Sequence, residues 1–186
     1  VTCCQYMPQN TGEGLEAGIW AGGVKDEHAT CMLFDRGGIA PGKSAGLPAQ
    51  GELFWMGSQP FLKTDVQGKR IANEDAPYDN MINAASLHKE HVWCSLWDAN
   101  YVEQIKQFHT ISCSRIDPSP TPGGWSFTYE AIAGMNEGLK HEGIIFEADT
   151  IEELAEKLEV PADTLVETVR QYNEMAAAGK DTVFGK

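Results

Sequence analysis

Apolar residues recur every three or four positions along several stretches of the chain, which is the spacing of one face of an α-helix. The first stretch has Leu15, Ile19 and Trp20 on one side. Thr11 can cap its start, and Gly22-Gly23 ends it. The same periodicity, with capping residues, predicts five further helices, at 80–89, 100–108, 127–143, from Thr150 onward and at 161–180.

Other stretches carry alternating or β-branched residues and predict strands at 30–34, within 52–74, at 91–98 and at 143–149. Gln67-Gly68 predicts a tight turn inside the second of these, because glycine accepts a positive φ. Residues 35–51 and 117–124 are rich in glycine and proline and predict loops. The mixed order of elements, without an internal repeat, predicts an α+β fold in which a small mixed or antiparallel sheet packs with helices.

The charge balance narrows the choice of partners. The formal net charge is −13, whereas binding to nucleic acid requires clustered Lys and Arg. We therefore expect no nucleic-acid partner. No stretch approaches the roughly 18 consecutive apolar residues of a membrane span, so none is expected. The sequence leaves the cellular compartment open.

Cysteines and histidines give no sign of a metal site. The five cysteines have no C-x-x-C spacing, and we expect buried or inert thiols. His88 and His91 are three residues apart, but no third ligand is evident. No metal is predicted.

Three segments together carry a family pattern: "TGEGLEAGIWAGG" (11–23), "DVQGKRIANED" (65–75) and "TIEELAEKLEVPADTLVETVRQYNEMAAAGKDTVFGK" (150–186). They resemble the flavin-dependent fumarate reductase, succinate dehydrogenase and 3-ketosteroid dehydrogenase flavoproteins. In that family, the first segment lies in an FAD-binding domain, and the stretch after it forms a capping, substrate-binding domain. The resemblance covers nearly the whole chain.

The resemblance implies that residues 1–29 belong to the edge of the FAD-binding domain and residues 30–186 to the capping domain. No G-x-G-x-x-G fingerprint for a dinucleotide occurs in the sequence. The chain also lacks an initiator methionine. We therefore expect a cap fragment, inactive alone, whose partners are the FAD-binding domain of the same parent chain and a small organic substrate. Relatives of this kind are often exported.

The resemblance also suggests a proton donor. Soluble fumarate reductases place a proton-donating arginine four positions after the glutamate of the N-E pair. The same count from Glu74 reaches Tyr78. A phenol can donate a proton if a neighbour lowers its pKa from about 10. The alternative role for Tyr78 is packing at the entrance of a helix after Pro77.

The substrate contacts of the family do not carry over. An ungapped count places Leu53, Phe54 and Gly57 where fumarate-type enzymes hold a carboxylate with Thr, Glu and Arg. These side chains cannot make charge-assisted hydrogen bonds, so a small dicarboxylate is disfavoured. A flatter, more apolar substrate held by Phe54, Trp55 or Phe61 fits better. The alternative for these aromatic residues is a buried sheet face.

Acidic residues near the two motifs are the remaining site candidates. Glu74, with Asn73 and Asp75, could orient the tyrosine or contact the substrate, or could satisfy the hairpin's own backbone. Glu13 and Gly14 stand where the family approaches its cofactor, FAD, although a helix-start acid beside the helix dipole explains Glu13 as well.

The leading interpretation is the substrate-binding cap of an FAD-dependent oxidoreductase that reduces or forms an activated C=C bond. Two alternatives stay open. One is dehydrogenation of the 3-ketosteroid type, which runs the same chemistry toward the alkene. The other is a stand-alone, non-catalytic binding module, which the missing dinucleotide fingerprint would fit.

Overall fold

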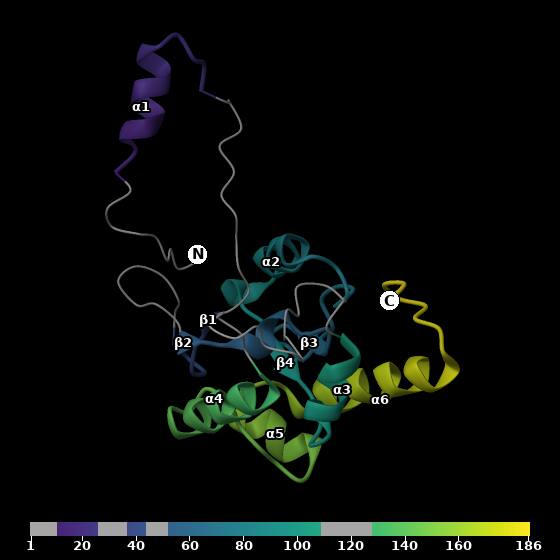
Figure 1. Cartoon of the computed structure of the whole chain (residues 1–186). Helices are drawn as coiled ribbons and strands as arrows, with labels where there is room; N and C mark the ends of the chain where they lie inside the picture. Colours follow the sequence, from purple (N-terminus) through teal and green to yellow (C-terminus); the bar gives the residue numbers. More distant parts are fainter. Residues whose placement is uncertain (1–10, 26–36, 44–51, 109–127) are drawn as a thin grey trace.

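The computed structural model describes residues 11–25, 37–43, 52–108 and 128–186. Among these residues the helices are α1 (Glu13–Trp20), α2 (Tyr78–Ser86), α3 (Tyr101–Phe108), α4 (Tyr129–His141), α5 (Ile151–Lys157) and α6 (Ala162–Ala178), with short 3-10 turns at Trp55–Ser58 and Lys89–His91. The strands are β1 (Gly37–Gly38), β2 (Glu52–Leu53), β3 (Leu62–Thr64) and β4 (Cys94–Leu96). The fold is α+β, as the sequence predicts (Figure 1).

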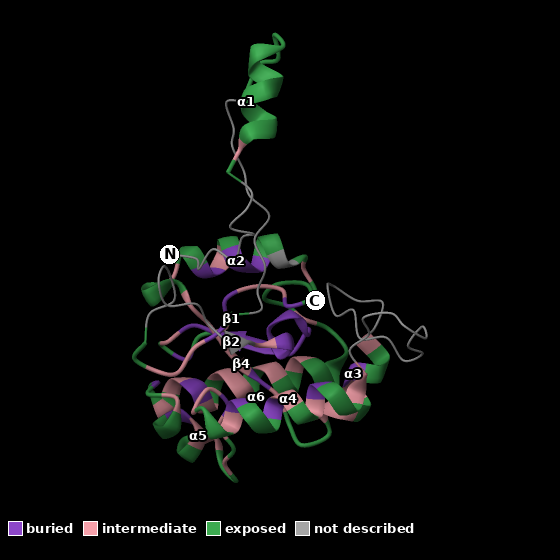
Figure 2. Ribbon diagram, turned by 60° about the vertical axis from the view of Figure 1, so that its left-hand side comes forward, coloured by how far each residue is buried: buried purple, intermediate pink, exposed green. Residues whose placement is uncertain are grey.

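The strands form two small antiparallel ladders. Strand β1 pairs with β2, and β3 pairs with β4 with Leu62 opposite Leu96. The ladder of β3 and β4 lies between helices, and the buried residues gather around it (Figure 2). None of the described helices is long and apolar enough to cross a membrane.

Three clusters of buried side chains hold the body together. One packs Leu62 and Leu96 of the ladder against α5 and α6 through Ala155, Val160 and Leu165. A second joins Trp55, Met56 and Phe61 to α3 and α4 through Ile105 and Ile132. The third packs Ile71 against Met81 and Ala85 of α2. Burial of this apolar surface is the main stabilising term.

The turn that joins β3 to the following segment is held by α6. Gly68 has φ +77°, the conformation that glycine tolerates best. A Cβ atom at this position would lie 3.0 Å from the backbone nitrogen of Leu165. The Thr168 hydroxyl donates a 2.7 Å hydrogen bond to the Gly68 carbonyl. The predicted turn at Gln67-Gly68 is confirmed, and its tip is an interface with α6.

Most predicted helices are confirmed, with shifts at their ends. Thr150 caps α5 by accepting a bond from the Glu153 amide. Helix α2 starts at Tyr78 behind Pro77, two residues before the predicted start, and Asp79 lies in its first turn. Gly12, and not Thr11, is the N-cap of α1. Proline and glycine set these two starts through backbone geometry.

The predicted strand at 143–149 is wrong. The amides of Ile144 and Ile145 both bond back to the Leu139 carbonyl, which closes the end of α4. Ile145 is buried there as part of a helix termination. The apolar pair therefore packs beside a helix end, and its amides are already used. The strand predicted at 91–98 is shorter and covers only β4, while the strand predicted at 30–34 lies outside the described residues.

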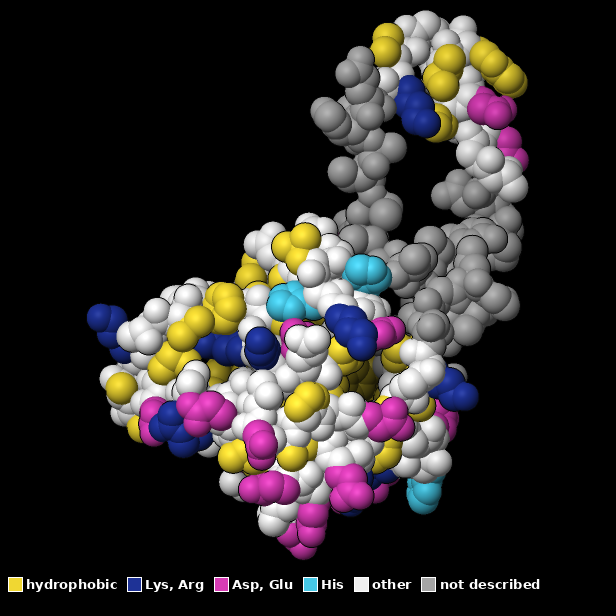
Figure 3. Space-filling model, turned by 180° about the vertical axis from the view of Figure 1, so that it is seen from behind, with side chains coloured by type: hydrophobic (Ala, Val, Ile, Leu, Met, Phe, Trp, Pro, Cys, Tyr) yellow, Lys and Arg dark blue, Asp and Glu magenta, His cyan; other side chains and the backbone are white. Residues whose placement is uncertain are grey.

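Helix α1 stands apart from the body that the other elements form (Figure 1, Figure 2). None of its residues is buried. Leu15, Ile19, Trp20 and Val24 are all exposed, Trp20 to 81%. Hydrophobic side chains are visible on the surface of this separate part of the molecule (Figure 3). An apolar helix surface of this kind is typical of an element that packs against something else.

Candidate functional site

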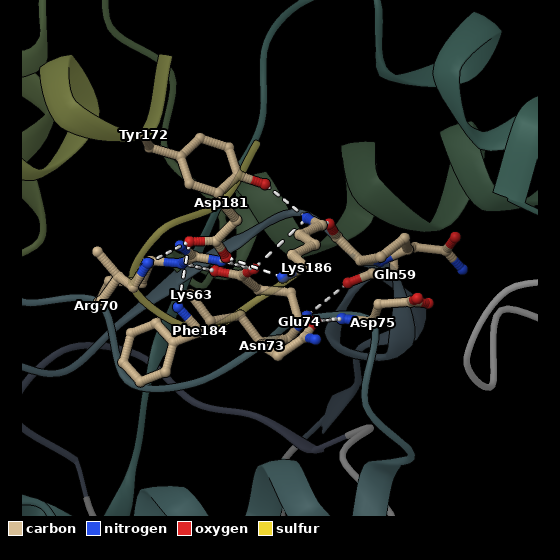
Figure 4. Close-up of polar contacts among 12 residues, drawn as sticks. Gln59, Lys63, Arg70, Asn73, Glu74, Asp75, Tyr172, Asp181, Phe184 and Lys186 are labelled. Atoms are coloured by element: carbon tan, nitrogen blue, oxygen red, sulfur yellow. Dashed lines mark hydrogen bonds and ion pairs between the residues drawn. The ribbon is translucent and has the colours of Figure 1, made fainter. Parts of the chain in front are cut away.

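A buried group of charges joins the segment after the turn to the end of the chain (Figure 4). Arg70 donates from Nε and Nη2 to the two carboxylate oxygens of Glu74, each at 2.7 Å. Its Nη2 atom also donates to Asp181 Oδ2 at 2.8 Å. The three side chains are 7%, 0% and 8% exposed. Charged side chains can be buried when they are paired and hydrogen-bonded to one another, as these three are.

Aromatic rings and a lysine complete this group. The Arg70 guanidinium lies 5.0 Å from the Tyr172 ring centroid and 5.1 Å from that of Phe184. Lys186 Nζ donates to the Tyr172 hydroxyl and the Pro60 carbonyl, each at 2.5 Å, and lies 3.4 Å from Glu74 Oε2. We call Arg70, Glu74, Asp181 and Lys186 the charge cluster. Its two cations balance its two carboxylates.

Asp181 organises the last turn of the chain. Its carboxylate accepts hydrogen bonds from the amides of Val183, Phe184 and Lys186, at 2.9, 3.1 and 3.0 Å. The Arg70 guanidinium and these amides hold the pKa of Asp181 well below its usual range. Burial by itself would lower the pKa of Arg70, but the bonds to Glu74 and Asp181 outweigh it and raise that pKa. Arg70 and Asp181 are therefore both ionised at neutral pH.

Arg70 and Glu74 of the charge cluster lie in the segment that leads to the start of α2. The Asn73 side chain accepts from the Asp75 amide at 2.9 Å, and the Ala76 amide donates to the Asn73 carbonyl at 3.1 Å. The helix then begins at Tyr78, with the amides of Asn80 and Met81 both bonded to the Pro77 carbonyl. The structure does not describe the side chain of Tyr78, so the role of this residue as proton donor stays a prediction.

The aromatic residues predicted to hold the substrate divide into two groups. Trp55 and Phe61 are each only 7% exposed and pack in the cluster with Ile105 and Ile132. Both residues are buried, as the alternative holds, but Trp55 lies in a 3-10 turn and Phe61 just before β3, so neither is on a sheet face. Phe54 is half-buried, lies 6.0 Å from the Trp97 ring centroid, and lines an open cavity of about 1530 Å³. Of the predicted substrate contacts, only Phe54 lines this cavity.

Sequence reasoning missed several residues at these sites. Trp97, Tyr101 and Asn136 line the cavity with Phe54, but they come from segments far apart in the sequence. The sequence pattern around these residues predicts helices and strands, but it does not indicate that they line one cavity. Arg70 and Asp181 stand inside two of the three quoted motifs, yet sequence reasoning assigned them no role. Their pairing joins positions 111 residues apart, and no local pattern reports such a contact.

The candidates for cofactor contact lie on α1, away from the charge cluster. Hydrogen bonds from the Thr11 hydroxyl and the Glu13 amide lower the pKa of the Glu13 carboxyl, and the role of Glu13 at the cofactor stays a prediction. A Cβ atom on Gly14 would meet nothing within 4 Å. The start of α1 is thus open enough to contact a group held elsewhere, but it cannot enclose one.

The remaining polar candidates are tied into local structure. His88 Nδ1 lies 2.9 Å from Asp65 Oδ2, and His91 Nδ1 lies 2.9 Å from the Ser86 carbonyl oxygen. Burial, with a contribution from Asp65, raises the pKa of the Cys94 thiol to about 11, so it stays protonated. The other four cysteines lie outside the described residues. Within the described ranges, no group of three metal-ligating side chains occurs.

Comparison with known proteins identifies oxidoreductases as relatives. The chain is 25% identical over 182 residues, 96% of its length, to the vinyl phenol reductase of Lactiplantibacillus plantarum. It is 56% identical over 45 residues, 24% of its length, to the NADH:acrylate oxidoreductase of Vibrio harveyi. A probable fumarate reductase of Shewanella frigidimarina is 39% identical over 54 residues, 29% of the chain. No family model matches the chain.

These names point to the fumarate-reductase-like oxidoreductases that the sequence motifs resemble. The chain spans 36% of the length of the vinyl phenol reductase, 4% of the acrylate oxidoreductase and 9% of the fumarate reductase. What the whole proteins do is therefore carried to this chain only as a proposal.

Proposed function

We propose that this chain is the substrate-binding cap of an FAD-dependent oxidoreductase that adds a hydride and a proton to an activated C=C bond. The observation that carries the proposal is the placement of Tyr78. It is the first residue of α2 and follows a hairpin whose Arg70 and Glu74 are fixed in a buried ion pair. The names of the relatives support the same class of chemistry.

The residues of this chain supply the substrate side of the reaction. Hydride addition to one carbon of the alkene leaves a carbanion at the other, and the Tyr78 hydroxyl donates the proton that converts it to CH. The phenolate then recovers a proton from water. Closing the cap over the substrate excludes water from this step. The flavin supplies the hydride and belongs to the rest of the parent protein.

Among the described residues, only those at the start of α1 are placed to contact a flavin. Glu13 and Gly14 at the start of α1 are open to a neighbouring group, while the body of the cap presents no glycine-rich phosphate cradle among its described residues. The exposed apolar residues of α1 support docking of this helix on a flavin-binding body. Glu13, Gly14 and α1 would thus form the seam with that body.

The residues near Phe54 favour a planar, apolar substrate over a small dicarboxylate. Phe54 and Trp97 both line the open cavity, and their ring centroids lie 6.0 Å apart. A vinyl-substituted ring or a short unsaturated acid suits such a surface better than two carboxylates. Glu74 is fully buried in its bond with Arg70, so we propose that it supports Tyr78 and does not contact the substrate.

Tyr78→Phe in the intact parent flavoprotein should slow alkene reduction by about 10²-fold, because the phenol is the general acid. Flavin content should stay unchanged. Stopped-flow reoxidation of the reduced flavin by 4-vinylphenol, acrylate and fumarate measures the rate and ranks the substrates. Flavin reduction by a 3-ketosteroid tests the dehydrogenation alternative.

A matched control is Tyr129→Phe, which removes another phenol at the first residue of a helix. It should leave the rate unchanged. Equal rates for wild type and Tyr78→Phe would end the role of Tyr78. Failure of every alkene to reoxidise the wild-type flavin would overturn the proposed function itself.

A further inference from the structure

The charge cluster and the start of α2 form one connected unit. Glu74 is held on one side by Arg70 and by the nearby Lys186 ammonium. Only three residues separate Glu74 from Tyr78. The intervening segment is fixed by the Asn73 turn, and Met81 of the first helical turn is buried against Ile71. The backbone at position 78 is therefore restrained from both directions.

The restraint originates in the last turn of the chain. Asp181 gathers three amides of residues 183–186 and simultaneously accepts from Arg70 Nη2. The turn places Phe184 over the guanidinium from one segment, while Tyr172 reaches it from α6. A planar guanidinium held by two carboxylates and two rings has little freedom to rotate.

We infer that Arg70 and Asp181 are positioning residues for the proton donor: the charge cluster fixes Glu74, and Glu74 fixes the start of α2 that carries Tyr78. This inference rests on the proposed function. Neither residue touches the substrate, so loss of the cluster changes the placement of the acid rather than the binding of the alkene. A misplacement on the order of 1 Å is enough to cost up to about 10²-fold in rate.

The kinetic test is a double-substitution cycle in the intact flavoprotein. Asp181→Asn should lower kcat by about 10-fold or more with little change in KM, because it disturbs proton transfer and not substrate binding. In the Tyr78→Phe background, where the acid is already absent, the same substitution should cost less than about 2-fold. A purely structural role would give the same loss in both backgrounds and would overturn the inference.

A second measurement does not depend on turnover. The amides of Asn80 and Met81 donate to Pro77 at the start of α2, so their hydrogen exchange reports on this turn. Asp181→Asn should speed their exchange. Arg170→Met is the matched control, because it removes an arginine that also holds two carboxylates, Glu167 and Glu174, but on the exposed face of α6. It should leave these amides unchanged.

If Asp181→Asn does not fold, Arg70→Lys is used in the same hydrogen-exchange test. Lysine keeps the positive charge but loses the bidentate bond to Glu74. Unchanged exchange at Asn80 and Met81 in a folded cluster variant would overturn the inference and leave the proposed function standing. Absence of alkene turnover by the wild type would instead overturn the proposed function and this inference with it. The two failures are thereby distinguishable.

Discussion

At the scale of single residues, Asp181 couples stability to pH. Its folded-state pKa lies below the unfolded value of about 3.9, chiefly through the bond from Arg70. A carboxylate with a lowered pKa stabilises the fold fully above the unfolded value, and this contribution is lost as the pH falls toward the folded value. The ion pair should therefore weaken only in acid.

We expect Asp181→Asn to destabilise the chain by about 3–5 kcal/mol at pH 7, because it leaves the Arg70 charge buried with one carboxylate fewer. The difference from wild type should shrink as the pH is lowered below about 4. Urea unfolding at a series of pH values from 7 to 2 measures both effects. A difference that is constant with pH would assign the loss to packing instead of charge.

Residue roles were the least predictable part of the site. The sequence identified Glu74 through its motif, and the structure explains its position through Arg70, four residues earlier. Asp181 was within a quoted motif without a role, because its partner lies 111 residues away. Trp55 and Phe61 looked equally suited to ligand or core. Only burial, which depends on the whole fold, separates those two roles.

At the scale of elements, the turn after β3 shows how one glycine holds an interface. Gly68→Ala should destabilise the chain by about 1–3 kcal/mol, because the new Cβ meets the Leu165 backbone and the φ of +77° is strained for alanine. Thermal unfolding measures the loss.

Gly134→Ala provides the contrast within the same chain. Gly134 lies inside α4, and an added Cβ would meet nothing within 4 Å. Alanine there should stabilise the helix by about 0.5–1 kcal/mol, since it lowers the entropy of the unfolded chain. Two alanine substitutions with the same sign would contradict this account of the turn.

Helices were predicted better than strands for a physical reason. A helix satisfies its own backbone, so periodicity and caps such as Thr150 locate it. A strand exists only where a partner pairs with it. Residues 62–64 find that partner at 94–96, while the apolar pair Ile144-Ile145 bonds to the end of α4 instead. No local pattern distinguishes these two outcomes.

At the scale of the whole molecule, the separation of α1 from the body is the feature most open to a direct test. Trp20 is 81% exposed and Trp55 only 7%. Trp20→Phe should therefore remove readily quenched fluorescence, and Trp55→Phe should remove protected fluorescence. Acrylamide quenching of the two variants measures this.

In the longer flavoprotein that we propose as the parent, we expect Trp20 to become protected, because α1 would pack against the flavin-binding body. The same quenching experiment on that protein decides the point. Trp20 fluorescence that is as accessible there as in the 186-residue chain would remove the support that α1 gives to the proposed seam.

The long separation between Arg70 and Asp181 also bears on how the chain is made. During synthesis Arg70 and Glu74 emerge more than one hundred residues before the aspartate that completes their group. Contacts this distant form slowly, because the loop between them must be ordered first. Nascent chains that stop before position 181 would therefore lack Asp181 and Lys186 of the charge cluster. We expect such chains to depend on chaperones and to be cleared by proteases.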